Sequence, residues 1–179
     1  MVSLSSYGQT YSSVISDSAI ISFMNWEVDN GKKYSEDCQI CKRKKVSTHL
    51  LSFDKLNFYW PDSISKIDHE YRYVHLFNSY NKLDTIFSYE EKEFFFEQFK
   101  AVKDSVWKHP LEKSKLRDTK SSLNLYSYSI PLFSSSRNYV LIKKSFYCGN
   151  VCAYGGIFLY RRVDKCGWEL VEVYNGWIS

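Results

Sequence analysis

The chain has 179 residues, with 24 lysines and arginines against 20 aspartates and glutamates, so its formal net charge is only +4. A chain of this length forms one domain of ordinary size, large enough to bury a hydrophobic core that needs no disulfide or metal ion for stability. The mild charge, with one short basic run at residues 42–45, argues against a nucleic-acid partner. No stretch approaches the roughly 20 apolar residues of a membrane span. The high content of tyrosine, phenylalanine and tryptophan favours β-sheet.

The N-terminal segment, residues 1–15, is rich in serine and tyrosine and predicts a flexible start. It also looks like the end of a secretory signal peptide, in which a small residue, Gly8, precedes the cleavage position before Gln9. The alternative is the loose polar start of a cytoplasmic protein. We therefore expect one α+β domain over residues 16–179, in a protein exported to the periplasm or cell envelope.

Two main helices are predicted. The first covers residues 17–30 after an N-cap at Ser16. The second follows a capping-box signature formed by Ser88 and Glu91 and extends to the proline at position 110. Their apolar faces are spaced as in amphipathic helices that face a core. These faces consist of Ile20, Phe23, Met24 and Val28 in the first helix and Phe95, Phe99, Val102 and Val106 in the second.

Strand-like runs dominate the last third of the chain. Residues 70–78 predict one strand by their alternation, and four further runs cover residues 125–133, 138–147, 156–163 and 168–174. Their short connections imply antiparallel neighbours, and Gly155-Gly156 predicts a bulge or a close backbone approach. The expected fold is α+β, with an antiparallel meander of four to six strands covered on one face by two helices. The curved sheet would have a concave face, as in the cone-shaped cystatin-like or nuclear-transport-factor-like folds.

The five cysteines allow several kinds of chemistry. Cys38 and Cys41 could join Cys148 and Cys152 in a four-thiolate zinc site, although the two pairs are far apart in the sequence and differ in spacing. The Cys38-x-x-Cys41 motif lies in a polar run without the strand–helix context of a redox centre. We therefore expect local disulfides, Cys148–Cys152 first and Cys38–Cys41 second, as in an oxidising compartment. Cys166 receives no role.

No catalytic constellation is recognisable. The sequence has no H-E-x-x-H motif, no G-x-S-x-G motif and no phosphate-binding glycine loop. Of its four histidines, His75 in the strand-like run 70–78 is the best candidate for a general base, paired with a carboxylate that the sequence does not identify. The motifs indicate neither a metal site nor a cofactor, and we expect a non-enzymatic protein over an enzyme.

The C-terminal half carries an S-x-P-x-F-S element, a C-G-x-x-C-x-x-G-G motif and a G-x-W-like element. These elements consist of Ser129, Pro131, Phe133, Ser134, Cys148, Gly149, Cys152, Gly155, Gly156, Gly167 and Trp168. In this pattern, and in Gln98 of the second helix, residues 83–179 resemble a family of small exported or lipoprotein-like proteins of unknown function from Bacteroidota. The resemblance implies export and pairing of Cys148 with Cys152, and it assigns no catalytic residue.

Tyrosine, tryptophan and arginine are common anchors of protein interfaces. Such residues occur near predicted turns, at Asn150 to Tyr154 and in the tail at Tyr174 and Trp177, although aromatic residues also commonly fill cores. We therefore expect a non-enzymatic envelope protein, such as an inhibitor or immunity-type protein, that binds a protein partner. The alternatives are a hydrolase with a His75–carboxylate site and a zinc-binding domain that uses Cys38, Cys41, Cys148 and Cys152.

Overall fold

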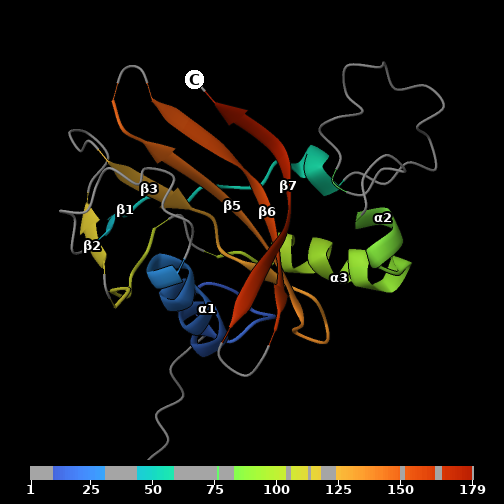
Figure 1. Cartoon of the computed structure of the whole chain (residues 1–179). Coiled ribbons are helices and arrows are strands. Elements are labelled where there is room, and N and C mark those ends of the chain that lie inside the picture. Colours follow the sequence, from blue (N-terminus) through green and yellow to red (C-terminus); the bar gives the residue numbers. More distant parts are fainter. Residues whose placement is uncertain are drawn as a thin grey trace, which may run out of the picture.

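The computed structural model describes residues 10–30, 44–58, 76, 83–103, 106–112, 114–117, 124–149, 152–163 and 167–178. Its helices are α1 (Asp17–Asn30), α2 (Leu83–Ile86) and α3 (Tyr89–Lys100), with one 3-10 turn, η1 (Lys55–Phe58). Its strands are β1 (Lys44–Ser47), β2 (Ser114–Arg117), β3 (Leu125–Tyr128), β4 (Leu132–Phe133), β5 (Tyr139–Tyr147), β6 (Ala153–Arg162) and β7 (Trp168–Ile178) (Figure 1).

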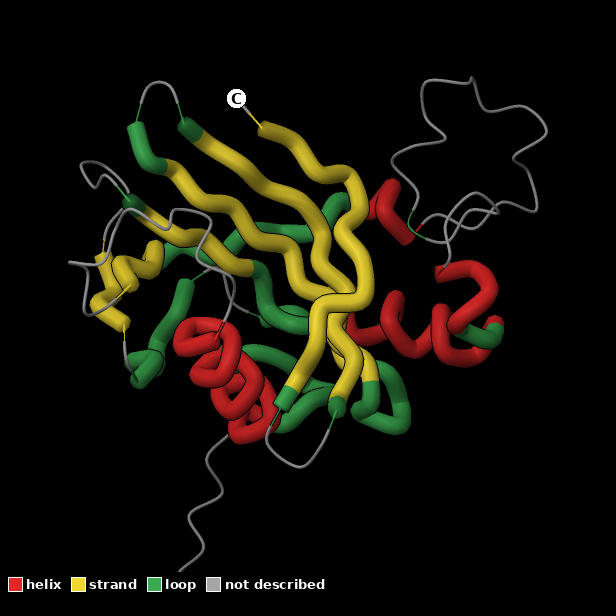
Figure 2. Tube along the Cα trace, viewed as in Figure 1, coloured by secondary structure: helices red, strands yellow, loops and turns green. Residues whose placement is uncertain are grey.

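The seven strands form one mixed sheet in the order β2-β1-β3-β5-β6-β7, with β4 also paired to β5. Strands β3, β5, β6 and β7 pair antiparallel, which confirms the predicted meander and the α+β class. Figure 2 shows β5, β6 and β7 as long neighbouring strands that curve through the molecule. Strand β1 extends this meander by lying parallel to both β2 and β3, a pairing that the short basic run at its start did not indicate.

The two main helices cover opposite faces of the sheet, so the prediction that both cover one face is wrong (Figure 1). Helix α1 packs in a core cluster with even-numbered residues of the central strands, such as Val140 and Phe158. Helix α3 packs in the other cluster with odd-numbered residues, such as Leu141 and Leu159. Successive side chains of a strand point to opposite faces, so a strand buried on both sides is apolar at nearly every position.

Helix α1 begins and ends where the sequence predicts, and its four predicted apolar residues are all buried. The carboxylate of Asp17 accepts hydrogen bonds from the backbone amides of Thr10 (2.8 Å) and Tyr11 (3.1 Å). Burial raises the pKa of Asp17, but these hydrogen bonds outweigh it and hold the pKa below its usual value. The charged Asp17 therefore fixes the preceding segment to the start of α1.

Residues 10–15, which precede the predicted domain start at residue 16, pack against the rest of the chain. Tyr11 is fully buried and Ile15 is almost so. The Tyr11 hydroxyl accepts hydrogen bonds from the amides of Lys108 (2.9 Å) and His109 (2.8 Å). Residues 1–9, where the signal-peptide remnant was expected, lie outside the described residues.

Helix α3 starts as predicted but ends early. The Ser88 hydroxyl accepts a hydrogen bond from the Glu91 amide at 3.4 Å. The predicted apolar stripe continued through Val102 and Val106, whereas the helix ends at Lys100 and both valines form isolated bridges with other segments. Valine is stiff in a helix and favours extended backbone, so these pairings end the helix.

The predicted strand over residues 125–133 is two strands, β3 and β4, with Pro131 between them. Proline has no amide to donate to a ladder, which explains the break.

The predicted strand 70–78 lies outside the described residues except for Leu76, which is fully buried. The likeness to cystatin-like or nuclear-transport-factor-like cones stays a prediction. None of the described helices is long and apolar enough to cross a membrane.

Candidate functional site

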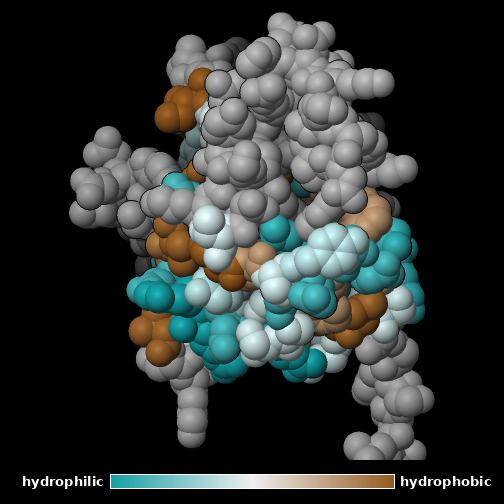
Figure 3. Space-filling model, turned by 90° about the vertical axis from the view of Figure 1, so that its right-hand side faces the viewer, coloured by the Kyte–Doolittle hydropathy of each residue, from teal (hydrophilic) through white to brown (hydrophobic). Residues whose placement is uncertain are grey.

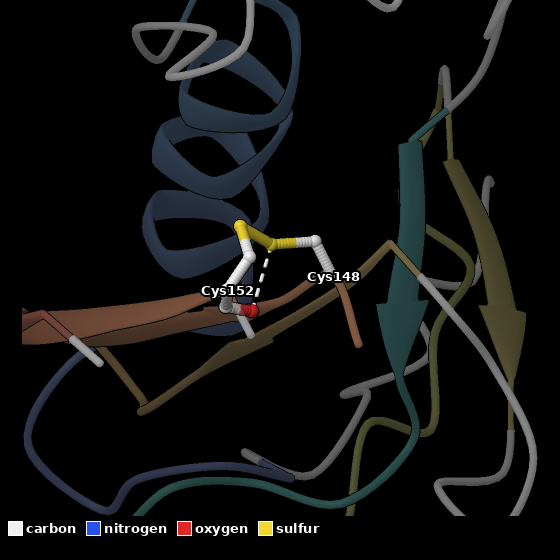
Figure 4. The surroundings of a disulfide bond; sticks show 2 residues. All are labelled: Cys148 and Cys152. Atoms are coloured by element: carbon white, nitrogen blue, oxygen red, sulfur yellow. Dashed lines mark hydrogen bonds between the residues drawn. A yellow bond between two sulfur atoms is a disulfide. The ribbon is translucent and has the colours of Figure 1, made fainter. Parts of the chain in front are cut away.

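A disulfide joins Cys148, at the end of β5, to Cys152, just before β6 (Figure 4). The Cα atoms of the pair are 5.2 Å apart, and the Cys148 amide donates to the Cys152 carbonyl at 2.9 Å. The first predicted disulfide is therefore confirmed. A bonded pair offers no thiolate to zinc, so the four-cysteine site requires the reduced protein. Cys38, Cys41 and Cys166 lie outside the described residues.

Removal of this bridge is expected to have a limited effect on stability. The loop that it closes spans residues 148–152, and in the chain-entropy model a loop this short stabilises the fold by about 2 kcal/mol. We expect that the double variant C148S/C152S unfolds at a lower urea concentration by about this free energy, with an unchanged circular dichroism spectrum. Reduction of the wild type adds about 2 Da to its mass for each bridge. An intact mass that reduction leaves unchanged contradicts the bridge.

Exposed apolar side chains gather at the disulfide end of the meander. The exposed fractions are 46% for Tyr147, 48% for Trp177 and 90% for Ile178. The register pairs Tyr147 with Ala153, Trp177 with Gly155 and Ile178 with Tyr154. Because successive side chains of a strand alternate, Tyr147 and Trp177 lie on one face of the sheet and Ile178 lies on the other. We call Tyr147, Trp177, Ile178 and the Cys148–Cys152 bridge the hairpin-end surface. It combines a cross-linked turn with the end of the edge strand β7.

Trp177 rests on a glycine. A Cβ atom at Gly155 would lie only 2.7 Å from atoms of the Trp177 ring, so the ring lies directly over the bare backbone of β6. The β6–β7 register also shifts between Gly155 and Ile157, which agrees with the prediction of a bulge or a close backbone approach at Gly155-Gly156. The Trp177 side chain therefore lies against β6 while about half of its surface stays exposed, at 48%.

The other predicted partner-binding residues are less accessible. Tyr154 is partly buried, with its ring 5.4 Å from that of Phe146. Tyr174 is 6% exposed in the α3-side core, and burial, followed by the charge of Glu172, raises its pKa above the usual value. Asn150 lies outside the described residues. Of the predicted residues that the structure describes, Trp177 offers the most surface to a partner.

A pocket of about 250 Å³ lies at the opposite end of the meander. It is bounded by α1, by the turn between β4 and β5, and by the ends of β6 and β7 that face each other. Its lining consists of Ala19, Ser22, Phe23, Trp26, Phe133, Arg137, Arg162 and Trp168. We call it the arginine pocket. No local pattern in the sequence indicates this pocket, because its residues come from separate elements that only the fold brings together.

A charged pair lies buried between α1 and the sheet. The Lys144 ammonium is 2.8 Å from a carboxylate oxygen of Glu27 and 2.9 Å from the Tyr160 hydroxyl. Both charged side chains are at most 3% exposed. A substrate cannot reach charges that are covered in this way, so the pair is structural. The sequence signals for it are a lysine within the apolar β5 and a glutamate four residues after Phe23, on the buried side of α1.

The described part of the chain contains no group of three histidine, cysteine, aspartate or glutamate residues that could hold a metal ion. His109 contacts the Tyr11 hydroxyl through its Nδ1 atom at 3.0 Å. His75, the candidate base of the hydrolase alternative, lies outside the described residues. That alternative therefore stays a prediction.

The described part of the face over α2 and α3 mixes small hydrophobic patches with hydrophilic residues (Figure 3).

No family model, no curated protein and no solved structure matches the chain. The resemblance to exported proteins of Bacteroidota therefore rests on the sequence pattern alone.

Proposed function

We propose that the protein is a non-enzymatic binding protein that holds a protein partner on its hairpin-end surface. The observation that carries the proposal is the exposure of Tyr147 and Trp177 on one face of the sheet at its disulfide end, with Ile178 exposed on the other face of the same end. Neighbouring large apolar side chains that stay exposed commonly mark interaction sites. Tryptophan and tyrosine supply a large share of the energy at such sites.

The local structure also suits binding. The disulfide fixes the β5–β6 turn, and Gly155 seats the Trp177 ring. Side chains that are already ordered lose less conformational entropy when a partner binds, so more of the contact energy contributes to affinity. An inhibitor or immunity-type protein is the kind of binding protein that we propose.

Export to the periplasm or cell envelope is part of the proposal. Disulfides persist in oxidising compartments and are rare in the cytoplasm, which supports export. Thr10 and Tyr11, whose amides bond to the Asp17 carboxylate, both follow the expected cleavage position before Gln9. Loss of the first eight residues therefore removes none of the buried contacts described for Tyr11 and Ile15.

The test is a pull-down with the oxidised protein against extracts of its own and competing cells, followed by measured affinity for any stoichiometric protein partner. We expect Trp177→Ala and Tyr147→Ala each to weaken that binding by about tenfold or more. Tyr89→Ala is the matched control, because Tyr89 is 59% exposed on α3, away from the hairpin-end surface. Its affinity should equal that of the wild type.

Two outcomes reject the proposal. One is a partner whose affinity is the same for Trp177→Ala, Tyr147→Ala and the wild type. The other is the absence of any partner together with a measurable hydrolysis that His75→Ala abolishes, which would make the protein an enzyme. Circular dichroism of each variant establishes that the fold is retained.

A further inference from the structure

The arginine pocket has aromatic walls. The Trp168 ring is nearly perpendicular to that of Phe23, with centroids 5.3 Å apart, and its centroid is 6.4 Å from that of Phe133. Trp26 extends the wall along α1, with its ring centroid 6.1 Å from that of Phe23. Rings in these orientations leave flat apolar surfaces on which a planar group can stack.

Two guanidinium groups complete the lining. Arg162 lies over the Trp168 ring, with its Cζ atom 5.8 Å from the ring centroid. Its backbone amide donates to the carbonyl of Asn138 at 2.8 Å, which places the turn that carries Arg137 beside the end of β6. Among the described residues, the Arg137 side chain has no ion-pair or hydrogen-bond partner.

None of the described residues that line the pocket carries a carboxylate. The alternation of β6 and β7 explains this composition. Arg162 pairs with Trp168, whereas the preceding Arg161 pairs with Glu169 on the other face of the sheet. The carboxylate of Glu169 forms its ion pair with Arg161 there. The described lining therefore carries two positive charges and no negative one.

The turn that carries Arg137 is well fixed. The Ser134 hydroxyl accepts hydrogen bonds from the amides of Asn138 (3.1 Å) and Tyr139 (3.0 Å), and the Ser135 amide donates to the Glu91 carboxylate at 2.9 Å. Arg137 itself has a φ of 58°, a left-handed conformation that costs a non-glycine residue roughly 1 kcal/mol. Such strain is common where a backbone must aim a functional side chain.

We propose that the arginine pocket binds a small molecule made of a flat apolar ring and one oxyanion, either a carboxylate or a phosphate. The ring stacks against Trp168 and Trp26, and the guanidinium forks of Arg137 and Arg162 bind the anion. A volume of about 250 Å³ suits a molecule of about the size of an aromatic amino acid. The proposal is independent of the hairpin-end surface, because the ten residues of β6 separate the two regions.

The test uses ligands that share a ring and differ in charge. Phenylacetate and phenyl phosphate are titrated into the oxidised protein, beside the neutral phenylacetamide and the cationic phenethylamine, with tryptophan fluorescence and calorimetry as readouts. At least one of the two anions should bind saturably and at least tenfold more tightly than the amide and the amine. The stronger anion identifies the oxyanion. Equal binding of the amide, or no saturable binding of either anion, overturns the proposal.

Two arginine variants locate the site. Arg137→Asn removes the guanidinium, while asparagine tolerates the left-handed backbone, so the turn should keep its shape. We expect it to weaken binding of the preferred anion by about tenfold. Arg161→Gln removes a positive charge from the residue next to Arg162, on the other face of the sheet, and should change the affinity by less than twofold. Binding that Arg137→Asn and Arg161→Gln affect equally contradicts the site.

Discussion

Replacement of Lys144 by methionine is expected to lower the free energy of unfolding by about 3–5 kcal/mol. In the wild type, the Lys144 ammonium is 2.8 Å from the Glu27 carboxylate and 4.1 Å from the centroid of the Phe158 ring. Methionine fills a similar volume but leaves the Glu27 charge in the core without its counter-ion. The loss is a large fraction of the 5–15 kcal/mol that stabilises a typical domain.

Urea unfolding followed by circular dichroism measures this loss. The matched control is Lys143→Met, which changes the neighbouring lysine on the other face of β5, where its ammonium contacts the Ser52 carbonyl at 3.1 Å. We expect a loss of about 1 kcal/mol or less in the control. The double variant E27L/K144M removes both charges and should regain most of the stability. A double variant no more stable than K144M contradicts the explanation by an uncompensated charge.

Replacement of Gln98 by leucine is expected to cost about 2–4 kcal/mol of stability. Gln98 is 1% exposed on α3, and its side-chain amide bonds to both backbone groups of Phe133. The Phe133 amide donates to Oε1 at 2.8 Å, and Nε2 donates to the Phe133 carbonyl at 2.5 Å. Leucine leaves the amide and the carbonyl of Phe133, in the two-residue strand β4, buried without these partners.

The same urea experiment distinguishes the role of the amide from that of the helix. Glu97→Leu changes the adjacent exposed residue of α3 and should alter stability by about 0.5 kcal/mol or less. Gln98→Glu keeps the shape but removes the donor, so its loss should be comparable with that of Gln98→Leu. The interpretation would be wrong if Gln98→Leu proved as stable as the wild type.

Local signals in the sequence were sufficient for much of the fold. The Ser16 cap and the apolar spacing gave the bounds of α1, and short connections between β-rich runs gave the antiparallel meander. The close spacing of Cys148 and Cys152 made a local bridge the favoured prediction, which the structure has. Each of these signals depends on residues close together in the chain, where the backbone limits the possible geometries.

The errors concern contacts between distant segments. Helix α3 ends early because Val102 and Val106 pair with segments that are remote in sequence. The continuous apolar runs in β5 and β6 indicated burial on both faces, but amphipathic helices do not reveal which face each one covers. The arginine pocket and the Glu27–Lys144 pair were missed for the same reason, since each requires the tertiary fold to bring its members together.

The position of α1 also affects the order of events during synthesis. The apolar face of α1 is covered by β5 and β6, so the chain must be extended from Asn30 to Arg162 before this helix can be buried. At a synthesis rate of about 5–20 residues per second, the ribosome needs on the order of 10 s for that extension. The nascent chain therefore remains without its core until most of it has been made. An unfolded chain is the form that a secretion channel can thread, so late core formation favours the proposed export.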